Sequence, residues 1–176
     1  MHTKRMIIDA MKRLLEKRNF ENITVIDVVK EAGIGRATFY KHFENKYELA
    51  TTLFSEYVTL EFFMMEYNGD NLNERIESLL VFLKNNREYF KKIFKIDGSE
   101  SFYIFLEKYF YESYQQHGKI RFGIEKFTDE QIFKMKFAAN QWAYCLKFWV
   151  NSKCEPDEKK YAQWLTSSIL KIEDIV

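Results

Sequence analysis

The stretch from Ile23 to Leu49 contains more helix start and stop signals than any other part of this 176-residue chain. Thr24 is a good helix N-cap, and the carboxylate of Asp27, three residues later, can accept a hydrogen bond from the Thr24 N–H. Gly33 is the residue type that best adopts the left-handed conformation found just after a helix end. These signals predict a short helix from Val25 to about Ala32.

A second helix is predicted to begin at Gly35 or Arg36, after a turn of roughly three residues. Two helices joined in this way form a helix-turn-helix, whose second helix is free to enter the major groove of DNA. Phe39 and Phe43 lie four residues apart on that helix, so they share one face and are expected to pack inward. A third helix should begin after Asn45, its predicted N-cap.

The segment from Thr24 to Leu49 has the pattern T-V-x-D-V-x-x-x-A-G-I-G-R-A-T-F-Y-K-H-F-x-N-K-Y-E-L. This pattern resembles the N-terminal DNA-binding domain of the TetR/AcrR family of transcriptional regulators. The resemblance extends over about Met6 to Ala50 and is loose beyond it. It implies a three-helix DNA-binding domain, which a first helix from Met6 to Arg18 would complete.

The candidate DNA contacts are small or hydrogen-bonding residues of the helix-turn-helix, together with Lys46. Lys46 falls in the first turn of the third helix, where a cation opposes the helix dipole. A phosphate contact would explain that position, although a lysine can also simply be tolerated at a solvated helix end. The candidate set is Thr24, Gly35, Arg36, Ala37, Thr38, Tyr40, Lys41, His42 and Lys46.

The composition predicts an all-α fold. One proline and six glycines leave little material for hairpins, and apolar residues recur at intervals of three and four. The third helix is predicted to run from Lys46 to about Tyr67 as a connector roughly 33 Å long. We expect a helix-turn-helix domain over residues 1–50 and a regulatory and dimerisation domain over residues 51–176. Residues 1–46 carry ten basic and six acidic side chains, net +4, and the rest carries 17 and 20, net −3.

An aromatic-rich helix is predicted from Glu100 to Gln116, followed by a loop from Gly118 to Phe127. A helix that is apolar on nearly all sides is buried, and its aromatic residues can either fill a core or line a ligand cavity. The candidate pocket residues are Tyr57, Phe105, Tyr109 and Tyr114.

The last two helices are predicted from Asp129 to about Asn151 and from beyond Pro156 to the C-terminal isoleucines. The first of them carries two apolar rows, of which one would suffice for the core and the other needs a partner. The family resemblance implies that two such helices from each of two chains form a four-helix dimer interface. The candidate interface residues are Trp142, Leu146, Trp149, Leu165, Ile169 and Ile172.

Several classes of protein are disfavoured. The three histidines are far apart in sequence, and no phosphate loop, nucleophile elbow or zinc spacing is present, so we predict no enzyme activity, metal or cofactor. Cys145 and Cys154 are expected to be reduced thiols. No apolar run reaches the roughly 18 residues of a membrane span, so a cytoplasmic protein without membrane contact is expected.

We interpret the chain as a homodimeric transcriptional regulator. The first hypothesis is a repressor that binds a roughly palindromic operator on double-stranded DNA and releases it when a small-molecule effector occupies the second domain. The alternative within this class is an activator, or a regulator that answers to a partner protein. Outside this class, the helix-turn-helix would serve protein contacts or structure alone.

Overall fold

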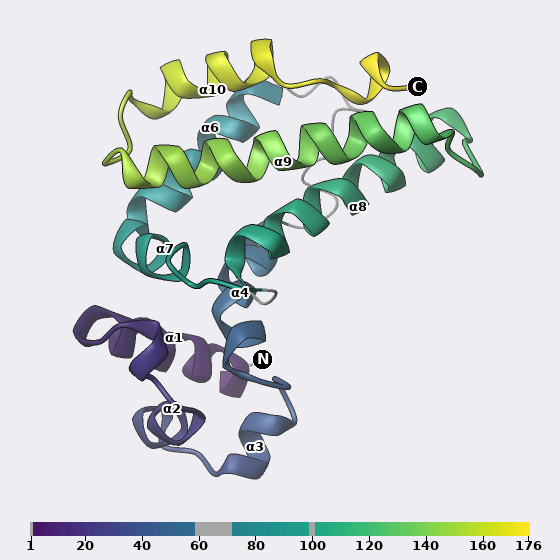
Figure 1. Cartoon of the computed structure of the whole chain (residues 1–176). Helices are drawn as coiled ribbons and strands as arrows, with labels where there is room; N and C mark the ends of the chain where they lie inside the picture. Colours follow the sequence, from purple (N-terminus) through teal and green to yellow (C-terminus); the bar gives the residue numbers. More distant parts are fainter. Residues whose placement is uncertain (1, 59–71, 99–100) are drawn as a thin grey trace. The chain divides into compact units, whose positions relative to one another are not determined.

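The computed structural model of the chain describes residues 2–58, 72–98 and 101–176. Within these ranges all regular secondary structure is helical, which confirms the all-α prediction (Figure 1). The α-helices are α1 (His2–Lys17), α2 (Val25–Ala32), α3 (Arg36–Tyr40), α4 (Lys46–Tyr57), α6 (Leu72–Asn85), α7 (Arg87–Ile93), α8 (Phe102–Phe122), α9 (Asp129–Asn151) and α10 (Glu158–Ser168). Two 3₁₀ turns are η1 (Phe20–Asn22) and η3 (Ile172–Asp174).

The chain forms two compact units. The N-terminal unit contains Met1–Tyr57 and Glu88–Phe102, and the C-terminal unit contains Val58–Arg87 and Tyr103–Val176. The helix α7 therefore belongs almost entirely to the N-terminal unit, although α6 immediately before it belongs to the other unit. The functional boundary expected at residue 50 stays a prediction.

The N-terminal unit has a core in which α1 contributes one apolar face. Ile7, Met11 and Leu14, which are four and three residues apart and so share one helical face, are buried. A second part of this core is an aromatic cluster in which the Phe102 ring lies 5.6 Å from Phe54 and 5.7 Å from Phe90. Since both partners are fully buried, this cluster fastens α7 and the start of α8 to α4.

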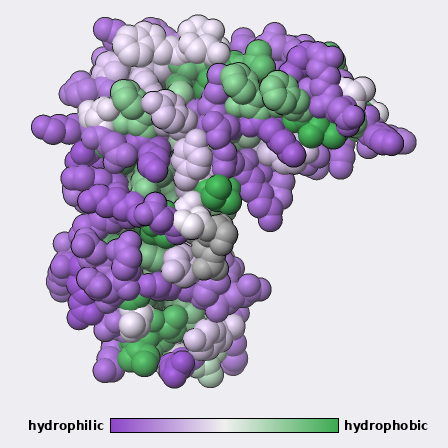
Figure 2. Space-filling view, viewed as in Figure 1, coloured by the Kyte–Doolittle hydropathy of each residue, from purple (hydrophilic) through white to green (hydrophobic). Residues whose placement is uncertain are grey.

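The C-terminal unit is built around α9, whose inner face is buried along its length. Trp149 stacks on Tyr161 of α10 with ring centroids 5.7 Å apart, and its indole N–H donates to the carbonyl of Pro156 at 2.8 Å. The Tyr161 hydroxyl donates to the carbonyl of Cys145 at 2.9 Å. These contacts hold α10 on α9, while apolar side chains remain visible along α9 on the face shown in Figure 2.

Two predicted boundaries are wrong in the C-terminal unit. The helix α8 continues through Gly118 to Phe122, where a loop was expected. A Cβ added to Gly118 would lie 2.8 Å from the ring of Phe127, so this glycine makes room for a side chain instead of ending the helix. The last helix ends at Ser168, and the backbone of Ile169 is extended. The expected connector is confirmed as a helix from Lys46 to Tyr57, and its continuation to Tyr67 lies outside the described residues.

The contact between Gly118 and Phe127 generates a testable prediction. Gly118→Ala should lower the free energy of unfolding in the wild type by about 1 to 3 kcal/mol, because the added methyl group displaces the ring. In a Phe127→Ala background the same change should raise stability by roughly 1 kcal/mol, since alanine is the better helix former. Urea denaturation of the wild type, the two single variants and the double variant measures both effects. Equal effects of Gly118→Ala in the two backgrounds would contradict the steric explanation.

Candidate nucleic-acid interface

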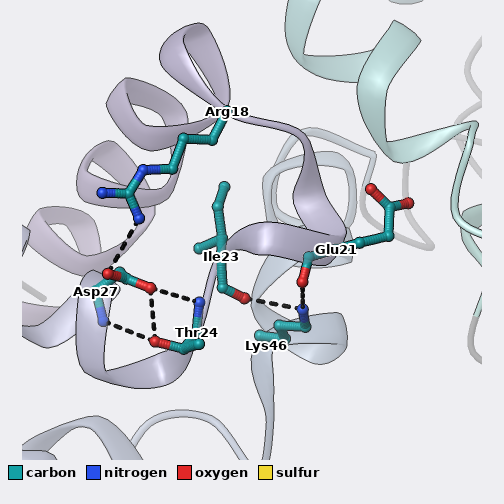
Figure 3. A network of polar contacts seen from close by, with 6 residues as sticks. All are labelled: Arg18, Glu21, Ile23, Thr24, Asp27 and Lys46. Atoms are coloured by element: carbon teal, nitrogen blue, oxygen red, sulfur yellow. Dashed lines mark hydrogen bonds and ion pairs between the residues drawn. The ribbon is translucent and has the colours of Figure 1, made fainter.

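The first helix of the helix-turn-helix, α2, begins with the predicted capping box (Figure 3). The Thr24 N–H donates to the Asp27 carboxylate at 2.9 Å, and the Asp27 N–H donates to the Thr24 hydroxyl at 3.2 Å. The Thr24 hydroxyl also donates to the Asp27 carboxylate, at 2.6 Å. This bond, the bond from the Thr24 N–H and the nearby Arg18 guanidinium lower the pKa of Asp27 to about 2. Because folding lowers the pKa of Asp27, its ionised carboxylate stabilises the folded state. This contribution to folding stability is complete above about pH 4 and is lost as the pH falls through about 2.

The turn between α2 and α3 depends on Gly33. Its backbone is left-handed, with φ of 67°, and the Ile34 N–H donates to the carbonyl of Val29 at 3.0 Å. This is the helix-ending hydrogen-bond pattern that a glycine favours. The next helix begins at Arg36 with Gly35 as an N-cap that forms no side-chain cap bond.

The second helix, α3, was expected to include Phe43 but ends at Tyr40. The chain continues as a turn through Lys41 and His42. Its orientation is fixed by Phe39 and Phe43, which are 0% and 2% exposed. Phe39 contacts Phe43 with ring centroids 5.7 Å apart. The burial of these two rings leaves the candidate DNA-binding side chains on the opposite side.

The structure brings most of the candidate DNA contacts together on that outer surface. Thr38 is partly buried, and the other residues predicted on α3 and its flanks are exposed. We call this surface the α3 face, and its members are Gly35, Arg36, Ala37, Thr38, Tyr40, Lys41 and His42. It offers a guanidinium, an ammonium, an imidazole and hydroxyl groups, which are the donors that read base edges and phosphates in protein–DNA complexes.

Lys46 differs from the other candidates because its ammonium group is already engaged. It donates to the carbonyls of Ile23 at 2.8 Å and Glu21 at 3.4 Å (Figure 3), and to the carbonyl of Phe20 at 3.1 Å. The same nitrogen lies 4.5 Å from the centroid of the Phe20 ring, and partial burial lowers its pKa. An ammonium has three N–H donors, so the expected phosphate contact would have to replace one of these bonds. Lys46 thus positions α4 against the turn that precedes α2.

Lys92 also binds backbone carbonyls and positions a helix, although the sequence did not predict this role. Lys92, on α7, donates to the carbonyls of Leu15, Glu16 and Arg18, where α1 ends. Nearby on the same helix, the fully buried hydroxyl of Tyr89 donates to the carbonyl of Ala50 at 2.7 Å. Because α7 is separated from α1 by about 75 positions, no local sequence signal identifies it as part of the N-terminal unit.

The predicted pocket residues have different surroundings in the described part of the chain. Tyr109 donates to the carbonyl of Val58 at 2.5 Å and stacks with Phe105, 6.1 Å between centroids. Tyr114 lines a cavity in the C-terminal unit that neither Phe105 nor Tyr109 lines. Tyr57 belongs to the N-terminal unit, at the end of α4. The aromatic residues of α8 are thus divided between packing and cavity walls.

The six candidate dimer residues lie in the interior of the C-terminal unit. Trp142, Leu146, Trp149, Leu165, Ile169 and Ile172 are each at most 7% exposed. This placement corrects the choice made from the sequence, since side chains buried within one protomer offer a partner no surface. The exposed row on α9 is the other one, and its members are Phe133, Phe137, Tyr144 and Phe148.

Comparison with known proteins identifies the helix-turn-helix. A profile described as "Bacterial regulatory proteins, tetR family" matches residues 7–53. The dhaKLM operon transcriptional activator DhaS of Lactococcus lactis subsp. lactis (strain IL1403) is 32% identical over 106 residues, which are 58% of this chain and 54% of that protein. The HTH-type transcriptional regulator YvkB of Bacillus subtilis (strain 168) is 26% identical over 98 residues, 56% and 52% of the two chains. The chain spans about half the length of the curated relatives it matches.

Two solved structures share the fold over nearly the whole chain. A TetR transcriptional regulator from Streptococcus agalactiae 2603V has a TM-score of 0.61 and 22% identity, and covers 96% of this chain and 94% of its own. The dihydroxyacetone kinase operon activator DhaS has a TM-score of 0.59 and 22% identity, with coverage of 95% and 96%. All of these proteins are named as regulators, in agreement with the prediction that the chain is not an enzyme. In the described part of the chain, no helix is long and apolar enough to cross a membrane.

The contacts of Lys46 lead to a prediction about stability. Lys46→Met should lower the free energy of unfolding by about 1 to 3 kcal/mol, because partly buried carbonyls lose their donor. Lys41→Met is the matched control, since Lys41 is exposed on the α3 face, and should change stability by less than about 0.5 kcal/mol. Chemical denaturation followed by circular dichroism separates the two variants. Equal stability of Lys46→Met and wild type would show that the three bonds are energetically unimportant.

Proposed function

We infer the function of this chain from its family: it belongs to the TetR family of bacterial regulatory proteins through its helix-turn-helix segment, residues 7–53. We propose that it is a DNA-binding transcriptional regulator whose α3 face enters the major groove of an operator. The observation that supports this most directly is the exposed set of donors on α3, held outward by the buried Phe39 and Phe43. Thr24, at the N-cap of α2, is proposed to contact a phosphate of the DNA backbone next to the bases that α3 reads.

We propose further that the regulator is a homodimer and that the exposed row on α9 forms its interface. Phe133 and Phe137 stack 6.3 Å apart, Tyr144 and Phe148 stack 6.1 Å apart, and all four are more than half exposed. Their spacing of four, seven and four residues places them on one helical face. Trp164 on α10 is also 49% exposed. Such contiguous apolar surface usually marks a contact with another protein.

A second copy of this chain is the occupant that fits this row. A two-fold axis would bring the same patch from both chains together and would pair two α3 faces with two operator half-sites about 34 to 36 Å apart. The operator is therefore proposed to be palindromic. Repression requires only occupancy of an operator that overlaps a promoter, and it is the first candidate mode. The second is activation, which the name of the Lactococcus relative favours.

The proposed DNA contact predicts different effects at two positions. Arg36→Ala should weaken binding to a selected operator by about 1 to 3 kcal/mol and relax base preference, if its guanidinium reaches a base edge. Lys41→Ala should weaken binding to all duplexes and reduce the salt slope by roughly one. Lys126→Ala, an exposed change in the C-terminal unit, is the control. Fluorescence anisotropy at several salt concentrations measures all three, and wild-type affinity for both α3 variants would refute the proposed DNA face.

The proposed dimer predicts a sharp difference between neighbouring positions of α9. Phe137→Glu places a carboxylate in the exposed row, so it should convert the dimer to a monomer and lower operator affinity at least tenfold. Lys136→Glu introduces the same group one residue away on another exposed face and should leave the dimer intact. Sedimentation velocity gives the assembly state. A wild-type monomer that binds a palindromic operator tightly would contradict the dimer proposal.

A further inference from the structure

The C-terminal unit contains a cavity lined by α8, α9, α10, the start of α6 and the segment after α10. It measures about 60 Å³, taken as the space open to the centre of a water molecule. Its apolar wall includes Phe110, Trp142, Leu165 and Ile169. Phe110 and Trp142 stack with centroids 5.4 Å apart, so this wall contains a pair of stacked aromatic rings. One water molecule needs roughly 10 to 15 Å³ on this measure, so the cavity has room for a small organic molecule of about one ring.

The polar side chains that line this cavity are those of Ser113, Tyr114, His117, Thr166 and Lys171. His117 and Lys171 line the cavity, and the described lining residues include no aspartate or glutamate. The hydroxyl of Tyr114 is already committed, because it donates to the carbonyl of Leu170 at 2.6 Å and accepts from the Trp142 indole at 3.1 Å. The Ser113 hydroxyl donates to the carbonyl of Tyr109 at 2.8 Å. A neutral imidazole offers one N–H and an ammonium three, so a ligand at this cavity is best matched by an acceptor or an anion.

The segment after α10 forms one side of the cavity. The backbone becomes extended at Ile169, and the lining includes the four residues from Ile169 to Ile172. Ile172 is 2% exposed and lies near Gly118, while the bond from Tyr114 holds Leu170. The cavity is thus a site of the C-terminal unit with one apolar wall, and the exposed Lys171 of this segment is one of its lining residues.

We propose that this cavity binds a small carboxylic acid with one compact apolar group, such as a single aromatic ring. The ring lies against Trp142 and Leu165, and the carboxylate is held by His117 and Lys171. This inference adds a small-molecule effector of stated class to the proposed function, and its role in regulation rests on that proposal. The binding itself does not require DNA.

Two soluble probes of the same shape test the ligand class. Benzoate and benzamide differ in charge but hardly in size, and isothermal titration calorimetry of the full chain at pH 7 measures both. Benzoate should bind at least tenfold more tightly than benzamide. His117→Leu and Lys171→Met should each reduce this ratio at least threefold. Benzamide affinity equal to or higher than that of benzoate would overturn the assignment of an acid.

A matched pair of substitutions tests the location. Ser113→Leu extends a side chain into the cavity, and should weaken benzoate at least tenfold. Ser78→Leu is the control, because Ser78 makes the same bond to the carbonyl four residues earlier but is exposed on α6. It should leave benzoate affinity within twofold of wild type. Thermal unfolding of both variants verifies that they are folded, and equal loss of binding in the two would overturn the site.

Probe binding and operator binding, both measured on the full chain, distinguish a failure of this inference from a failure of the proposed function. A chain that binds a selected operator but neither probe at millimolar concentration would overturn the cavity site and leave the regulator proposal intact. A chain that binds benzoate with the predicted variant pattern but binds no duplex would support the site and refute the DNA-binding function.

Discussion

The burial of Phe39 and Phe43 is the constraint on which the proposed DNA-reading surface depends. The helix α3 has five residues, far fewer than the roughly 12 to 15 that an isolated helix needs to be even marginally stable in water. It exists because the ring of Phe39 on α3 and the ring of Phe43 just after it are anchored in the core of the N-terminal unit. The same anchoring determines which side chains stay exposed. The four-residue spacing of the two phenylalanines therefore sets both the packing of α3 and the orientation of the α3 face.

Lysine side chains that bind carbonyl groups organise the rest of the N-terminal unit. Lys46 satisfies the carbonyls of the turn before α2, and Lys92 satisfies those at the end of α1. Carbonyls at helix ends lack intrahelical partners, and a cation there is favoured by the helix dipole as well. In this way two lysines distant in sequence hold α4 and α7 against the ends of earlier helices. A charge that is counted as basic in the sequence is therefore not always available to DNA.

The C-terminal unit shows how one helix can serve two surfaces. The row of α9 that includes Trp142, Leu146 and Trp149 is buried within the protomer, and the row that includes Phe137 and Tyr144 is exposed. Both rows have helical spacing, so periodicity predicts two apolar faces without deciding which one is internal. That decision depends on where α10 and the segment after it pack. Trp149 is internal because Tyr161 stacks on it and Pro156 accepts its N–H.

The sequence by itself determined the all-helical class, the capping box at Thr24, the turn at Gly33 and the inward side of α3. These features follow from interactions among residues at most five positions apart, which the local sequence pattern reports directly. Only the tertiary structure decided that Lys46 binds carbonyls, that α7 belongs to the N-terminal unit and that α8 runs through Gly118. It also decided that Tyr114, but not Tyr109, lines the cavity. Each of these depends on contacts between residues more than eight positions apart, and a one-dimensional pattern carries no record of which distant groups will meet.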